Sequence, residues 1–133
     1  MMDEVIHIYD DFRKKFVVLT PEEWVRQHFA HFLTETLGYP KGRLKMEYEI
    51  NYHGRVKRPD IGVIDRDGRP FLLVECKAPS VSLTEAVLLQ VATYFSIEGG
   101  HYLAMTNGLN HIFAQVKPSD SKLVYMKELP SFQ

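Results

Sequence analysis

The spacing of apolar and polar residues predicts that strands and helices alternate along this chain. From 46 to 52, apolar side chains occupy every second position, as in a strand with one buried face. Two apolar runs at 61–64 and 71–74 flank Asp67-Gly68, where a tight hairpin turn is favoured because glycine accepts positive φ. The other expected strands are 5–9 and 15–19 around Asp10-Asp11, 101–106 and 111–116 around Asn107-Gly108, and 123–126.

Two helices are predicted from their start and stop signals. Thr20 is an N-cap with proline in the first turn, and the helix that follows is expected to run to Leu37, before a glycine. A second helix is expected to begin at the capping box 82–85, to reach about residue 98, and to end at the glycine pair 99–100. The apolar stripes are Val25, Phe29, Phe32 and Leu33 in the first helix, and Leu83, Val87, Val91 and Phe95 in the second.

The order of these elements indicates the fold class. A helix, an antiparallel meander, a crossover helix and further strands are typical of an α/β domain with a central mixed β-sheet flanked by helices. With 133 residues and 45% hydrophobic content, the chain has enough core for one domain, and it shows no repeat or linker. We therefore expect a single domain over 1–133.

Composition and charge limit the cellular location and the kinds of site that we expect. The first ten residues carry several charges and no apolar segment of the signal-peptide kind, and the chain has no long apolar run, so we expect a cytoplasmic protein without membrane contact. The single cysteine excludes an intramolecular disulfide and a cysteine-based zinc cage. The net charge of −1 offers little overall attraction to nucleic acid.

Three charged residues stand at the ends of the two central apolar runs. Asp60 precedes the first run, and Glu75 and Lys77 close the second, two residues apart and therefore on one face of a strand. A hairpin brings all three together at one end of the sheet. Buried charges are costly unless a cation or a reaction uses them, whereas charges on an exposed hairpin are simply solvated. The continuous apolar run before Glu75 favours the buried alternative.

The chemistry that fits this group is that of a hard metal ion. Mg²⁺ prefers carboxylate, carbonyl and water oxygens, and Asp60, Glu75 and the main-chain carbonyl of Cys76 offer such oxygens. Mn²⁺ is an expected substitute. Lys77 is positioned to orient a water or to offset charge on a phosphate in the transition state.

These residues resemble the signature of the PD-(D/E)xK nuclease superfamily. Pro59-Asp60 and Glu75-x-Lys77 match its core, and the sequence from Gln90 to Tyr94 is similar to the Q-x-x-x-Y element found with that core in type I restriction enzymes. The segments 20–27 and 106–108 also resemble the N-terminal domain of type I restriction enzyme R subunits. The resemblance implies a restriction-endonuclease-like fold, DNA as substrate, and Mg²⁺-dependent endonuclease activity through a metal-activated water.

Two supporting roles are left open by the sequence. Gln90 and Tyr94 are four residues apart, so they share a helix face and either support the site or form an ordinary polar edge. By helical phase Glu22 lies on the apolar face and is the candidate for an extra metal ligand, while Glu23 points away from that face and suits the capping box. The helix dipole explains both acids without any metal.

Binding and partners are less defined. A basic stretch containing Arg55, Lys57 and Arg58 is the candidate DNA contact. No P-loop motif occurs, so the chain lacks the ATP-driven motor of a full restriction subunit, and partner proteins would supply motor or specificity functions. The alternative is a non-cleaving nucleic-acid-binding or protein-interaction module that retains the fold. DNA specificity and oligomeric state do not follow from the sequence.

Overall fold

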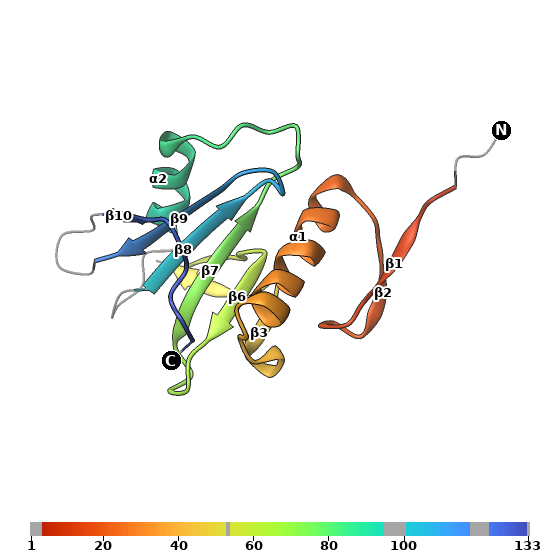
Figure 1. The fold of residues 1–133 in the computed structure, drawn as a ribbon, viewed down its shortest axis with the longest axis horizontal. Coiled ribbons are helices and arrows are strands. Elements are labelled where there is room, and N and C mark those ends of the chain that lie inside the picture. The colour runs from red at the N-terminus through yellow and green to blue at the C-terminus, as the bar shows by residue number, and fades with distance from the viewer. Residues whose placement is uncertain (1–3, 53, 95–100, 118–122, 133) are drawn as a thin grey trace.

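The computed structural model describes residues 4–52, 54–94, 101–117 and 123–132, which form a layered α/β structure (Figure 1). Its elements, in chain order, are β1 (His7–Asp10), β2 (Lys15–Val18), α1 (Pro21–His31), a π-helical turn (Phe32–Thr36), a 3-10 turn (Lys41–Arg43), β3 (Leu44–Met46), β4 (Ile50–Tyr52), β5 (Arg55–Lys57), β6 (Ile61–Ile64), β7 (Pro70–Cys76), α2 (Glu85–Tyr94), β8 (His101–Thr106), β9 (His111–Val116) and β10 (Leu123–Met126).

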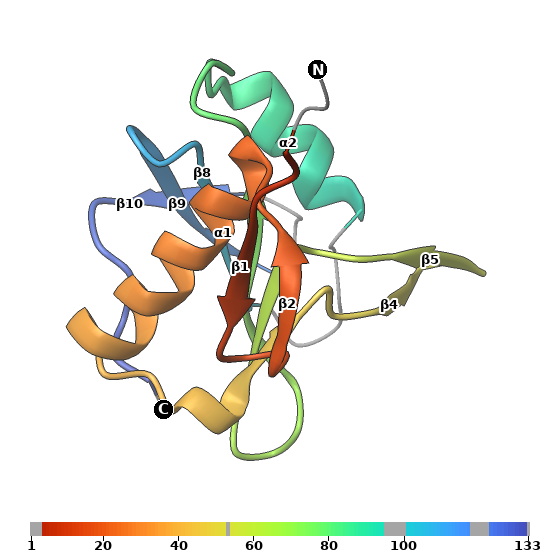
Figure 2. The same ribbon diagram turned by 90° about the vertical axis from the view of Figure 1, so that its right-hand side faces the viewer.

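Six strands make the central sheet in the order β10-β9-β8-β7-β6-β3. Strands β7 and β8 run parallel and are joined through α2, while the other neighbours are antiparallel. The sheet is therefore mixed, and α1 and α2 cover opposite faces of it (Figures 1 and 2). This confirms the predicted fold class.

The helix α1 packs its apolar stripe on one face of the sheet. Val25, Phe29 and Leu33 are buried and join a core cluster with Leu72 and Val74 of β7. The predicted N-cap is present, because the hydroxyl of Thr20 accepts the N–H of Glu23 at 3.0 Å. The predicted end near residue 37 is also correct, although the last turn is π-helical rather than α-helical.

The helix α2 covers the opposite face. Its fully buried residue is Leu88, which packs with Met105 and Ala114, and the predicted stripe residues Leu83 and Val87 lie beside them only half-buried. The N-cap prediction was off by two residues: the hydroxyl of Thr84, not that of Ser82, accepts a helix N–H, at 3.2 Å. The predicted helix end at 95–100, with Phe95, lies outside the described residues.

The predicted strand from 46 to 52 is broken in the structure. Glu47 has a φ of +53°, and its N–H donates to the Asp60 carbonyl at 3.0 Å, which ends β3. Tyr48 then packs closely against Gly62, which has no side chain to obstruct it. The chain leaves the main sheet at this point, and β4 pairs instead with β5 in a small hairpin that projects from the body (Figure 2).

The hairpin of β1 and β2 forms around residues 11–14, close to the predicted turn. It lies on the outer side of α1, away from the sheet (Figure 1). Asp10 at its end is fully buried, whereas Tyr9 and Phe16 stack edge to face and remain exposed. Among the described residues, no helix is long and apolar enough to cross a membrane.

Candidate functional site

The two predicted carboxylates come from neighbouring strands at one end of the sheet. In the antiparallel pair β6–β7, Ile61 lies opposite Val74, so Asp60 just before β6 comes next to Glu75. One Asp60 oxygen, Oδ2, accepts the backbone N–H of Cys76 at 2.7 Å. The sequence expectation that a hairpin brings these residues together agrees with this geometry.

Lys77 lies beside Glu75, as their spacing on one strand face predicts. Its Nζ is 3.4 Å from Glu75 Oε1, and the two side chains are 32% and 22% exposed respectively. The backbone N–H of Lys77 donates to the Thr106 carbonyl of β8 at 2.8 Å. The lysine is thus fixed by two central strands while its ammonium remains accessible to a ligand.

Burial shifts the pKa of both acids upward, and a neighbouring negative charge adds to each shift. Burial, with the neighbouring Asp60 charge adding to it, raises the pKa of Glu75 to about 7, although Lys77 opposes the shift. Burial also raises the pKa of Asp60, against the Cys76 hydrogen bond and the charge of Arg26. Each shift reports a carboxylate whose ionised form is poorly compensated, which a bound cation would relieve.

The donor set fits a hard cation that keeps part of its water shell. Two carboxylates with an adjacent main-chain carbonyl are a typical protein contribution to a Mg²⁺ site. Within the described ranges, no group of three or more His, Cys, Asp or Glu side chains is arranged to hold a metal. The Cys76 thiol is buried and its pKa is raised by that burial, so its carbonyl oxygen, and not its sulfur, is the candidate donor.

The structure reverses the sequence assignment of the two glutamates at the start of α1. Glu23, expected to point away, is buried with 6% exposure, whereas Glu22 is exposed. The reason is charge pairing rather than helical phase, because Arg13 of the hairpin donates to Glu23 Oε1 at 2.7 Å. Glu22 still acts on the site, since its charge adds to the raised pKa of both Asp60 and Glu75.

No described contact joins the two residues of the Q-x-x-x-Y element, Gln90 and Tyr94, to the carboxylates. Gln90 lies in α2 and is exposed, and no hydrogen bond or ion pair in the described part of the chain joins it to Glu75 or Lys77. Tyr94 is the last residue of α2, and its side chain lies outside the described part of the structure. The supporting role of this pair stays a prediction.

The candidate DNA-contact residues lie on the projecting β4–β5 hairpin and just after it. Arg58 is exposed and forms an ion pair with the exposed Glu49 at 2.9 Å. Lys57 is half-buried in β5, and the side chain of Arg55 is outside the described set. The hairpin projects into solvent (Figure 2), where a long ligand has access to it.

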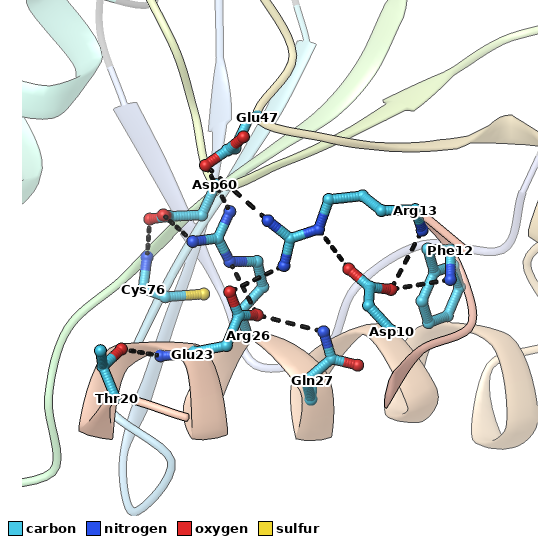
Figure 3. Close-up of polar contacts among 10 residues, drawn as sticks. All are labelled: Asp10, Phe12, Arg13, Thr20, Glu23, Arg26, Gln27, Glu47, Asp60 and Cys76. Atoms are coloured by element: carbon cyan, nitrogen blue, oxygen red, sulfur yellow. Dashed lines mark hydrogen bonds and ion pairs between the residues drawn. The ribbon is translucent and has the colours of Figure 1, made fainter. Parts of the chain in front are cut away.

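A network of charged side chains beside the site, some of them buried, was missed from the sequence. Arg26 of α1 approaches Asp60, with Nη2 3.8 Å from Oδ1, and Glu47 lies next to both (Figure 3). Arg13 then links Asp10 to Glu23 and so ties the β1–β2 hairpin to α1. The only sequence signal was the spacing of Glu23 and Arg26, which are three residues apart on the helix. Many exposed ion pairs on helices have the same spacing, so it does not indicate burial.

Comparisons with known proteins found a matching family model and a similar crystal structure. The family model described as "Type I restriction enzyme R protein N terminus" matches residues 21–130, which include both acids and the lysine. A crystal structure from Anabaena variabilis ATCC 29413, described as a candidate nuclease belonging to DUF820, resembles 90% of this chain and 75% of that chain, at 12% identity and a TM-score of 0.47. No curated protein matches significantly.

Proposed function

The chain belongs to the family of the type I restriction enzyme R protein N terminus, and from this premise we propose that it is a metal-dependent deoxyribonuclease. The reaction is hydrolysis of a DNA phosphodiester by an activated water. The observation that carries the proposal is the partly buried pair of Asp60 and Glu75 with the Lys77 ammonium beside it.

The carboxylate pair is the proposed cation site. Asp60 and Glu75 would hold Mg²⁺ or Mn²⁺ together with the Cys76 carbonyl, and Glu22 is near enough to add negative charge. The bound cation would supply positive charge for a phosphate oxygen and lower the pKa of a water. The Cys76 N–H already fixes Asp60, so little reorganisation of that carboxylate is needed on binding.

Lys77 is proposed to act on the attacking water or on the phosphate. Its Nζ, 3.4 Å from Glu75, reaches the space where a phosphate would meet the carboxylates. There its ammonium donates hydrogen bonds to the water or to a phosphate oxygen, and it offsets the negative charge that grows in the transition state. Gln90 and Tyr94 of α2 are proposed to support this arrangement without contacting the cation.

DNA is the proposed substrate, and its backbone is proposed to run along Arg55, Lys57 and Arg58. A net charge of −1 gives little general attraction to DNA, so these local cations and partner proteins would provide most of the binding. Partners with motor or specificity functions fit the family to which the chain belongs.

A second function has an observation in its favour. Asp60 is already paired with Arg26 at 3.8 Å, and the described residues offer two acidic side chains rather than three at the site. A module that binds nucleic acid or protein without cleaving would tolerate a site in which Asp60 already has a cationic neighbour. The same fold would then serve as a scaffold.

A cleavage assay separates the two functions. Purified protein is incubated with supercoiled, linear and branched DNA in Mg²⁺ or Mn²⁺, alongside Lys77→Ala and the control Lys45→Ala, which removes an exposed lysine of β3. We expect cleavage by the wild type and the control, and its loss in Lys77→Ala with DNA binding retained, because the ammonium acts mainly in the transition state. Absence of cleavage in every condition would favour the non-cleaving module.

A further inference from the structure

Arg26 is surrounded by carboxylates yet bound tightly to none of them. Its side chain is 12% exposed, and its nitrogens lie 3.3 Å from Glu23, 3.6 Å from Glu47 and 3.8 Å from Asp60 (Figure 3). Two of those nitrogens, Nε and Nη1, are buried and form no hydrogen bond in the described structure. A buried donor without a hydrogen bond is costly, so Arg26 is held here by attraction to the surrounding carboxylates rather than by well-formed hydrogen bonds.

The other members of the network are hydrogen-bonded without Arg26. Glu23 accepts from Arg13 at 2.7 Å and from Gln27 at 3.1 Å. Asp10 accepts from the Arg13 guanidinium and from two backbone N–H groups. The hydrogen bonds of Asp10 and Glu23 are thus made without Arg26, and the positive charge of Arg26 is shared among Glu23, Glu47 and Asp60.

We propose that Arg26 is the internal counter-ion of the carboxylate pair: it balances Asp60 in the metal-free protein and competes with a divalent cation for that carboxylate. The inference rests on the proposed function, because it takes Asp60 as a metal ligand. Arg26 is a positioning residue and touches no substrate. The Arg26 guanidinium lies 3.8 Å from Asp60, so it repels a cation that approaches this carboxylate. Arg26 therefore stabilises the metal-free fold and lowers the affinity for the cation.

Glu47 competes with Asp60 for the positive charge of Arg26. It is 54% exposed, it lies within ion-pair distance of both Arg13 and Arg26, and its backbone N–H donates to the Asp60 carbonyl. When a cation takes Asp60, Glu47 and Glu23 remain as partners for the displaced guanidinium. The network thus offers Arg26 a second set of carboxylates without any change of fold.

Calorimetry with Mn²⁺ at pH 8 tests the proposal through binding rather than through activity. We expect Arg26→Met to bind Mn²⁺ about tenfold more tightly than the wild type, because a competing positive charge has been removed from a partly buried site. Arg26→Lys keeps the charge and should bind as the wild type does. Arg58→Met removes an arginine from an exposed pair and should leave Mn²⁺ binding unchanged. A purely structural role for Arg26 predicts weaker binding in Arg26→Met.

A second variant covers the case in which Arg26→Met fails to fold. Glu47→Gln alters an exposed side chain, and it should weaken Mn²⁺ binding because Arg26 then pairs more fully with Asp60. Unchanged or weaker binding in Arg26→Met, or unchanged or tighter binding in Glu47→Gln, would overturn the counter-ion role.

The double variant Asp60→Asn/Glu75→Gln separates this failure from failure of the proposed function. If wild-type binding depends on both acids but Arg26→Met shows no gain, the function survives and the inference does not. If the wild type binds no Mn²⁺, or the double variant binds it equally well, both are wrong.

Discussion

Replacing Glu75 by Gln should stabilise the metal-free protein at high pH but not at low pH. The folded state raises the pKa of Glu75 from 4.5 to about 7, because burial and the charge of Asp60 disfavour its ionised form. The folded protein therefore holds this proton more tightly than the unfolded chain does. Stability is unaffected by the group below about pH 4.5, falls as pH rises toward 7, and carries the full penalty above it.

The size of the effect follows from the same shift. Each pKa unit corresponds to about 1.4 kcal/mol, so a pKa raised from 4.5 to about 7 corresponds to roughly 3 kcal/mol. The side chain is 22% exposed and solvent screens part of its charge, so we expect a gain of about 2 kcal/mol for Glu75→Gln at pH 8.5. Glutamine has nearly the same shape, so the gain comes from removing the charge.

Urea unfolding in EDTA at pH 5 and pH 8.5 measures this gain. The free energy of unfolding of Glu75→Gln should exceed that of the wild type by only a small part of this gain at pH 5 and by the whole of it at pH 8.5, while the exposed control Glu49→Gln should show no such change. Excess Mn²⁺ at pH 8.5 should stabilise the wild type more than the variant. A variant that is less stable than the wild type at pH 8.5 would refute the view that the Glu75 charge is uncompensated.

Three further outcomes are expected. Asp10→Asn should cost about 3 kcal/mol at pH 7 in urea unfolding, because Arg13, whose side chain is only 14% exposed, loses its fully buried charged partner and keeps only Glu23 close by; no measurable loss would show that Arg13 is satisfied by Glu23 alone. Gly62→Ala should cost about 1–3 kcal/mol, because a Cβ there would lie 2.8 Å from the Cβ of Tyr48, whereas Gly42→Ala meets nothing within 4 Å and should be neutral. In the cleavage assay, Lys77→Arg should restore little of the activity lost in Lys77→Ala, because a planar guanidinium places its donors differently, and full activity would argue for a simple charge effect.

Local sequence signals predicted most of the sheet. The dipeptides Asp67-Gly68 and Asn107-Gly108 mark real turns, and both glycines adopt positive φ, at +82° and +87°. The break after Met46 could not be read from the alternating pattern, which continues through it. It depends on the contact between Tyr48 and Gly62, which exists only after β3 has paired with β6.

The candidate site also has one part that the sequence predicted and one part that it did not. The approach of Asp60 to Glu75 follows from hairpin register, and the position of Lys77 follows from the two-residue period of a strand. The network around Arg26 follows from neither, because its members come from separate elements. Glu23 is the clearest case: helical phase places it outward, but Arg13 of the preceding hairpin makes its burial favourable.

The central claim is that Asp60 and Glu75 share one divalent cation, and anomalous diffraction from crystals soaked in Mn²⁺ tests it most directly. We predict one strong anomalous peak within coordination distance of both carboxylates and near the Cys76 carbonyl, and its absence in Glu75→Gln crystals. A peak at any other position, or no peak between the two carboxylates at Mn²⁺ concentrations that saturate binding in solution, would contradict the claim.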